Sequence, residues 1–178
     1  QADSEPETEE EIVPEEESIR EKIQEIIDGM SLEEKAAQLF MITPEALTGV
    51  GQVTQAGEGT KSAIEEYPAG GIIYFAQNLQ DPEQVRNMTE KTQEYSMERT
   101  GLPMLLSVDE EGSAVTRFGN NPQFGFDSSA DMQEIGKSGD PQKAYELGTR
   151  IGSFLADLGF NMDNAPVADV LSNPENTV

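Results

Sequence analysis

The sequence predicts an α/β protein with a parallel sheet, and three observations support this fold class. Unbroken apolar runs typical of buried strands occur at residues 69–76 and 103–108, and a strand with its following loop is expected at 160–170. Helical patterns separate these runs, and two of them start with Asp-Pro, at residues 81–82 and 140–141. No short hairpin turn joins two strands, so parallel βαβ units are expected.

Two helices are expected before the first strand. The first ends at Gly29 and carries four isoleucines on one face: Ile19, Ile23, Ile26 and Ile27. Ser31 and Glu34 have the spacing of a capping box, which predicts that a second helix begins there. That helix leads into residues 39–42, a short apolar run suited to a buried strand.

The later elements follow from glycines and from apolar periodicity. Four glycines between Thr48 and Thr60 predict a long loop, whose glycine spacing fits neither a dinucleotide-binding fingerprint nor a P-loop. The helix that starts at 81–82 has one apolar face, made of Val85, Met88, Thr92 and Tyr95. The helix that starts at 140–141 is expected to end at Gly159 and to bury Ala144, Leu147, Ile151, Leu155 and Leu158.

Composition excludes several classes of function. The 178 residues fit one ordinary domain, and 35 acidic against 11 basic residues give a net charge of −24, which would repel nucleic acid. Cysteine and histidine are both absent, so a thiolate nucleophile and a Ser-His-Asp triad are excluded. No apolar run approaches the ~18 residues that direct membrane insertion requires. The acidic residues lack the spacing of a calcium loop, so no metal or organic cofactor is implied.

Residues 1–18 are expected to form a disordered acidic tail or linker, and 19–178 the folded body. The tail holds nine acidic residues and no basic one, and it cannot bury enough apolar surface to fold. It would act either as a solubilising tail or as a spacer below an anchor removed upstream, since the chain begins with Gln1. With the absent cysteine, this suggests an extracellular or cell-surface protein, and a cytoplasmic location stays open.

The most informative segment is residues 105–112, where three carboxylates follow the carboxyl end of a buried strand. Parallel α/β folds place their chemistry at that end of the sheet. Asp109 is therefore a candidate ligand-binding residue, although it could instead cap an acidic turn. Arg117 lies eight residues later, near enough to pair with a carboxylate and bind a sugar or carboxylate ligand, or to form an ordinary loop ion pair.

Other carboxylates have weaker cases. Glu110 and Glu111 are rejected as a catalytic pair, because adjacent residues leaving a strand point in different directions. Asp163 and Asp169 flank the segment 165–167 after the next strand, and bracing of that loop is the favoured interpretation for both.

Five blocks in order resemble the N-terminal domain of family 3 glycoside hydrolases, and within it the β-N-acetylhexosaminidase branch. The blocks are MSLEEKAAQLFMIT (30–43), GGIIYFAQNLQDPEQV (70–85), GLPMLLSVDEEG (101–112), VTRF (115–118) and LGFNMDNAPVADV (158–170). The branch has two glycines and an arginine after the third strand, where this chain has Gly112, Ser113 and Ala114.

This resemblance implies a parallel (β/α)8 TIM-type barrel of which the chain supplies roughly the first half. It also implies hydrolysis, with retention, of terminal β-linked N-acetylglucosamine, as in cell-wall turnover. Asp109 would bind sugar hydroxyls, and Arg117 would lie in or brace the same subsite. The nucleophile and the acid/base would lie beyond Val178, so no catalytic residue is assigned in this chain, which alone is expected to be inactive.

Length agrees with this interpretation, because a full barrel needs ~250 residues. The expected partners are a carbohydrate substrate and either the missing carboxyl-terminal half of the barrel or a second copy, since a half barrel leaves open sheet edges. The alternatives are a non-catalytic sugar-binding or assembly module, and a β-glucosidase of the same family. The block at 70–85 favours the hexosaminidase type over the latter.

Overall fold

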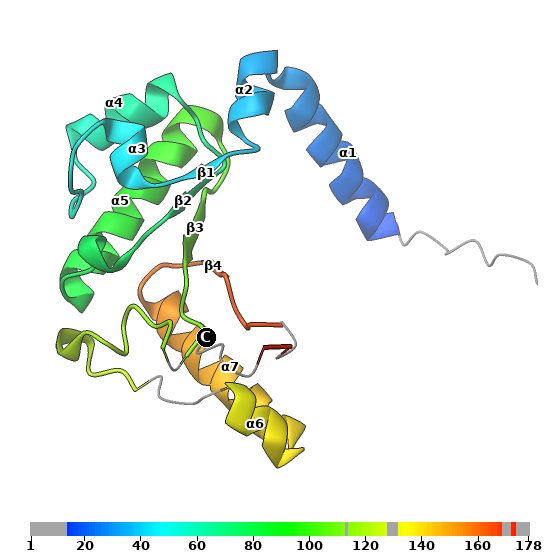
Figure 1. Ribbon diagram of the computed structural model, residues 1–178. Coiled ribbons are helices and arrows are strands. Elements are labelled where there is room, and N and C mark those ends of the chain that lie inside the picture. The colour runs from blue at the N-terminus through cyan, green and yellow to red at the C-terminus, as the bar shows by residue number, and fades with distance from the viewer. Residues whose placement is uncertain (1–13, 113, 128–131, 169–171, 174–178) are drawn as a thin grey trace, which may run out of the picture.

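The computed structural model describes residues 14–112, 114–127, 132–168 and 172–173. It is an α/β arrangement around one parallel sheet (Figure 1). The strands are β1 (Met41–Ile42), β2 (Gly71–Ile73), β3 (Leu105–Val108) and β4 (Met162–Asp163). They lie in the order β1-β2-β3-β4, and all neighbours are parallel. Each strand is therefore added beside the previous one, as in the wall of a β/α barrel.

Helices connect the strands. They are α1 (Pro14–Gly29), α2 (Leu32–Ala37), α3 (Pro44–Thr48), α4 (Glu58–Glu66), α5 (Pro82–Thr100), α6 (Met132–Ser138) and α7 (Pro141–Asp157), with short 3-10 turns η1 (Ala76–Asn78) and η2 (Pro122–Phe124). The predicted start signals hold: Ser31 and Glu34 form the capping box of α2, and Asp81 and Asp140 cap α5 and α7.

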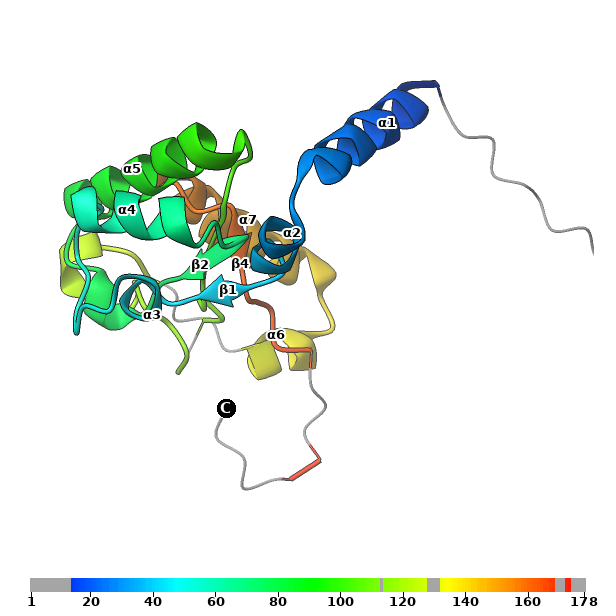
Figure 2. The ribbon, with the colours of Figure 1, turned by 90° about the horizontal axis from the view of Figure 1, so that it is seen from above.

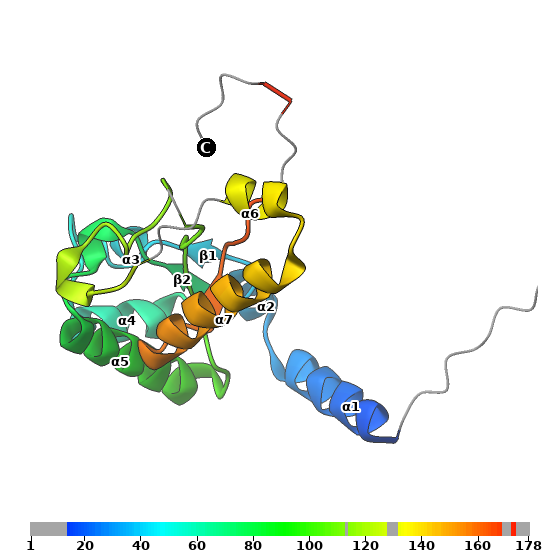
Figure 3. The same ribbon diagram turned by 90° about the horizontal axis from the view of Figure 1, so that it is seen from below.

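The core lies between the sheet and helices α4, α5 and α7, which occupy the same side of the strands in Figure 3. Alternate strand residues, including Ile72, Leu106 and Val108, are fully buried on that face. Near the carboxyl end of the sheet the core is aromatic. The Phe118 ring packs edge-on against Phe124 and Phe160, with centroids 4.8 and 5.8 Å apart.

The opposite face of the sheet is only partly covered. Leu105 keeps 48% of its surface exposed and Met162 keeps 37%, although both belong to strands. Ser107, the register partner of Met162, is buried and donates a hydrogen bond to Met41 Sδ at 3.0 Å.

The amino-terminal region differs from the expected boundaries. Helix α1 begins at Pro14, so residues 14–18 belong to a helix and not to the tail; residues 1–13 lie outside the described part, and the tail prediction stands for them as a prediction. Proline suits a first helical turn, because its missing N–H has no partner there anyway. Helix α1 extends away from the sheet (Figures 1 and 2), and its four isoleucines remain 40 to 51% exposed.

Smaller corrections concern single segments. Leu39 and Phe40 precede β1 and are exposed, so the first strand is shorter than predicted. Ala144 is exposed, whereas the other four residues expected on the same face, Leu147, Ile151, Leu155 and Leu158, are buried. The loop predicted for 48–60 ends where α4 begins at Glu58. None of the helices in the described ranges is long and apolar enough to cross a membrane.

Candidate functional site

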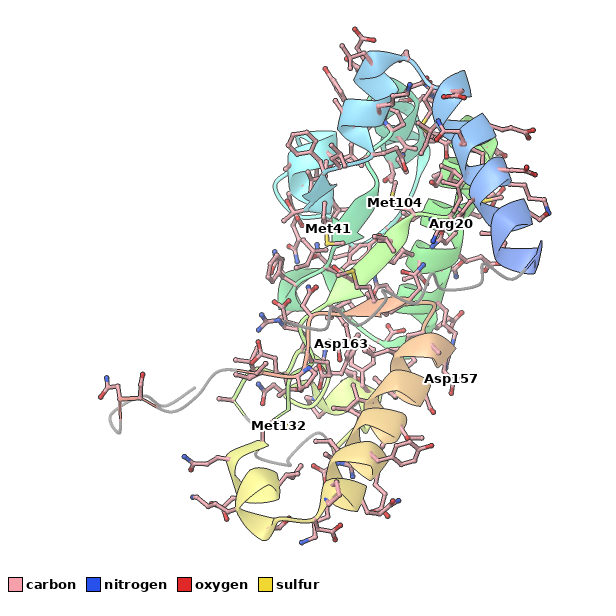
Figure 4. All side chains as sticks on the ribbon, turned by 90° about the vertical axis from the view of Figure 1, so that its right-hand side faces the viewer. Arg20, Met41, Met104, Met132, Asp157 and Asp163 are labelled. Carbon is pink, nitrogen blue, oxygen red and sulfur yellow. The ribbon has the colours of Figure 1, made fainter. Side chains whose placement is uncertain are left out.

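The candidate site lies at the carboxyl end of the sheet. Because all four strands are parallel, the residues that follow them meet at one edge. Asp109 follows β3 directly and Asn164 follows β4. Figure 4 labels Asp163 at this end of β4, well apart from Met104, which precedes β3.

Asp109 is held by two side-chain donors, one on each carboxylate oxygen. Arg117 Nη2 lies 2.8 Å from Oδ2, and Asn164 Nδ2 donates to Oδ1 at 3.0 Å. The side chains of Asp109 and Arg117 are 19% and 24% exposed, so this ion pair is largely withdrawn from water yet reachable. Each carboxylate oxygen has two lone pairs, which leaves Asp109 able to accept further hydrogen bonds in a fixed orientation.

Arg117 is fixed on a second side by an aromatic ring. Its guanidinium carbon lies 5.5 Å from the centroid of Phe75, a cation–π distance. Its Nε is buried and has no hydrogen-bond partner among the described residues. The guanidinium is thus oriented by Asp109 and Phe75 together.

Phe75 is held in turn by a buried asparagine. Asn78, with no exposed surface, accepts from the Phe75 N–H at 2.9 Å and donates to Glu45 Oε1 at 2.5 Å and to the Val53 carbonyl at 2.8 Å. These bonds join helix α3 and the loop that follows it to the turn after β2. The backbone at Phe75 is therefore held in place, through Asn78, by Glu45 and Val53.

Glu110 has a different role from the adjacent Asp109. Its side chain is fully buried and accepts hydrogen bonds from the Thr116 hydroxyl, the Arg117 N–H at 2.7 Å and the Phe118 N–H at 3.0 Å. A carboxylate enclosed by the loop at 116–118 is not free to act with Glu111 as a catalytic pair.

Asp163 joins β3 to β4. Its Oδ1 accepts from the Glu110 N–H at 2.9 Å. Burial raises the pKa of this carboxyl to about 6, against the lowering effect of that N–H, and the nearby carboxylates of Glu110, Asp109 and Glu111 raise it further. This position matches the bracing interpretation; Asp169 lies outside the described residues.

Two residues of the candidate site, Phe75 and Asn164, are not predicted from the sequence. Both follow strands at the same edge of the sheet as Asp109, and this shared position is the sequence feature that could have identified them. Within the described part of the chain, no group of three or more acidic, histidine or cysteine side chains is arranged to hold a metal ion. The arrangement can bind hydroxyl groups by charge-assisted hydrogen bonds.

Comparison with known proteins matches residues 31–178 to the glycosyl hydrolase family 3 N-terminal domain. Beta-hexosaminidase A of Pseudoalteromonas piscicida is 33% identical over 117 residues, which are 65% of this chain and 19% of that protein. Beta-hexosaminidase of Bordetella pertussis is 36% identical over 107 residues, 57% of this chain and 28% of that protein.

A solved relative agrees in fold. The glycoside hydrolase family 3 β-N-acetylglucosaminidase from Paenibacillus sp. str. FPU-7 superposes with a TM-score of 0.66 at 34% identity, covering 78% of this chain and 24% of the solved one. The chain thus spans between about a fifth and three tenths of the length of these relatives.

Proposed function

This chain belongs to glycosyl hydrolase family 3, and from that premise we propose that it is the amino-terminal part of a retaining β-N-acetylhexosaminidase acting on terminal β-linked N-acetylglucosamine. The observation that carries the proposal is the oriented Asp109 at the carboxyl edge of the sheet, held by Arg117 and Asn164. The names of the relatives, β-hexosaminidases and a β-N-acetylglucosaminidase, support the choice of sugar.

In this proposal Asp109 accepts hydrogen bonds from two sugar hydroxyls. A carboxylate accepts hydrogen bonds at both of its oxygens, and Arg117 already holds one of them. Arg117 is placed to donate to a sugar oxygen at the same subsite. Hydrogen bonds to sugar hydroxyls that strengthen in the transition state contribute to glycoside hydrolysis.

The described residues of this chain supply binding and not the bond-breaking pair. Retaining hydrolysis uses two carboxyl-type groups roughly 5 Å apart across the glycosidic bond. Here Glu110 is enclosed, Asp109 is paired with Arg117 and Asp163 braces the strands. We therefore assign the nucleophile and the acid/base to sequence carboxyl-terminal to Val178, and we expect residues 1–178 alone to show no turnover.

The test is Asp109→Asn in the full-length enzyme, with a chromogenic β-N-acetylglucosaminide as substrate. The variant keeps the shape and removes the charge and half of the acceptors. We expect kcat/KM to fall about a hundredfold with Tm nearly unchanged. Glu111→Gln is the matched control, as it neutralises a carboxylate of the same turn. A lowered Tm with normal kcat/KM of the folded fraction would make Asp109 a structural residue.

A substrate panel separates the alternatives within the family. Faster hydrolysis of a β-glucoside than of the β-N-acetylglucosaminide would establish a β-glucosidase instead. Sugar binding without turnover of either substrate by the full-length protein would establish a non-catalytic module. The extracellular or cell-surface location, supported by the acidic amino-terminal segment and the absent cysteine, is tested by fractionating the source cells.

A further inference from the structure

We propose that Glu110 is a positioning residue, which fixes the backbone of residues 116–118 so that the Arg117 guanidinium reaches Asp109. The inference rests on the proposed function, because it assigns a role within the same sugar subsite. Glu110 itself does not contact the sugar.

The first argument is the number and origin of the donors. The carboxylate of Glu110 has no exposed surface, and its three donors all come from consecutive residues: the Thr116 hydroxyl and the N–H groups of Arg117 and Phe118. An ionised carboxylate only accepts hydrogen bonds, so it matches a set made only of donors. An amide or an apolar side chain at this position would leave donors unpaired.

The second argument is the path from Glu110 to the subsite. The Arg117 backbone N–H is held by Glu110 at 2.7 Å, while the guanidinium of the same residue pairs with Asp109 at 2.8 Å. Asp109 and Glu110 are neighbours at the end of one strand. The loop is thus fastened to β3 twice, once through its backbone and once through the side chain that carries the function.

The third argument is that Glu110 also connects to the other partner of Asp109. The Glu110 N–H donates to Asp163 Oδ1 at 2.9 Å, and the next residue, Asn164, donates to Asp109. On the far side of Arg117, the Phe118 ring is fixed in the aromatic cluster with Phe124. Glu110 is therefore hydrogen-bonded to one of the donors that orient Asp109, Arg117, and to the residue that precedes the other, Asn164.

The experiment is a double-mutant cycle in the full-length enzyme, combining Glu110→Gln with Arg117→Ala. We expect Glu110→Gln alone to lower kcat/KM for the β-N-acetylglucosaminide at least tenfold. In the Arg117→Ala background the same change should lower it less than about twofold, because Glu110 acts through Arg117. Equal fold losses in the two backgrounds, or no loss in either, would overturn the proposal.

Thr116→Val provides a milder variant in case Glu110→Gln folds poorly. It removes one donor to Glu110, and with it the acceptor of the Gly119 N–H, and it preserves side-chain shape, so we expect a smaller loss of kcat/KM that again disappears with Arg117→Ala. Glu111→Gln is the control that changes a neighbouring carboxylate outside this set of bonds. An effect of Glu111→Gln as large as that of Glu110→Gln would show that charge, and not positioning, is responsible.

Amide hydrogen exchange provides a readout that does not depend on activity. In Glu110→Gln the amides of Arg117 and Phe118 should exchange faster, while those of α5 keep their protection. Absence of turnover by the unmodified enzyme would refute the proposed function, and the exchange result would still decide whether Glu110 holds the loop. Unchanged exchange at 117 and 118 would overturn the positioning role on its own.

Discussion

The two faces of the sheet differ in how deeply they bury apolar side chains. Leu105 and Leu106 are adjacent in β3; Leu106 is fully buried against the helices, whereas Leu105 on the opposite face keeps 48% of its surface exposed. We call the face that packs against α4, α5 and α7 the outer face and the opposite one, with Leu105, the inner face. The inner face also exposes part of Met162. Apolar strand residues without full cover indicate a surface that further structure would stabilise.

The partly exposed inner face is consistent with the chain covering only a small part of its relatives' length. The chain spans 19% of one β-hexosaminidase and 28% of another. We interpret the inner face as the side on which the remaining strands of the barrel would close, since barrel interiors are filled by side chains. The outer face, in contrast, is packed against helices α4, α5 and α7. The two faces should therefore respond differently to equal changes.

The largest expected effect is that of Leu106→Ala. Deleting a fully buried leucine side chain removes apolar burial and leaves a cavity, so we expect a loss of about 3 kcal/mol in the free energy of unfolding. Leu105→Ala in the same 178-residue chain should cost less than about 1 kcal/mol, because that side chain is half exposed. Chemical denaturation measures both.

The two leucine variants can also be compared in the full-length protein. There Leu105→Ala should lower the free energy of unfolding nearly as much as Leu106→Ala, because closure of the barrel would bury the inner face. A cost for Leu105→Ala that stays small in the full-length protein would show that the inner face remains open, and the half-barrel interpretation would fail.

The next effect concerns association of the 178-residue chain. Its inner face and its edge strands β1 and β4 present apolar side chains and unpaired backbone groups, while the charge of −24 opposes contact between copies. Raising ionic strength from about 0.05 M to about 0.5 M shortens the screening length and should increase association in sedimentation velocity. A single 19.4 kDa species at both salt concentrations would contradict this expectation.

A smaller effect is expected at the carboxyl edge from Asp163→Asn. The folded-state pKa of Asp163, about 6, lies above its ordinary value of 3.8, so the folded state favours the protonated form. Ionisation therefore lowers stability as the pH rises from about 4 to about 6, and the loss is then constant. The Asn variant resembles the protonated form and should be more stable than the unmodified chain at pH 7.

The expected gain is about 1 kcal/mol at pH 7, reduced from the full linkage value because the Asp163 side chain is only partly buried. It should shrink as the pH falls and disappear below about pH 4, where Asp163 is protonated in both the folded and the unfolded state. Denaturation at the two pH values measures the difference. Identical pH profiles for the two proteins would show that neither burial nor the neighbouring carboxylates destabilise ionised Asp163.

The smallest effect is expected from removal of residues 1–13. This acidic segment has too little apolar content to pack on either face of the sheet. Its deletion should change Tm by less than about 1 °C, as measured by thermal unfolding. A larger drop in Tm would show that the segment docks on the folded body, and we would then expect it to pack on the inner face.

Helix starts and outer-face packing were predictable from the sequence. Ser31, Asp81 and Asp140 cap helices through hydrogen bonds that span two or three residues, so the signal and the structure lie in the same short segment. The spacing of the isoleucines from Ile19 to Ile27 correctly predicts one side of a helix, but it does not predict that this side is exposed. Periodicity identifies an apolar face, whereas burial depends on what other segment covers it.

The candidate site divides in the same way. The sequence by itself determined that Asp109 follows a buried strand and that Arg117 is close enough to pair with it, because eight residues of loop limit their separation. Only the tertiary structure decided that Glu110 turns inward, that Asn164 reaches Asp109 across 55 residues of sequence, and that Phe75 lies beneath Arg117. Such contacts depend on how the strands align side by side, and this alignment cannot be predicted from local residue patterns.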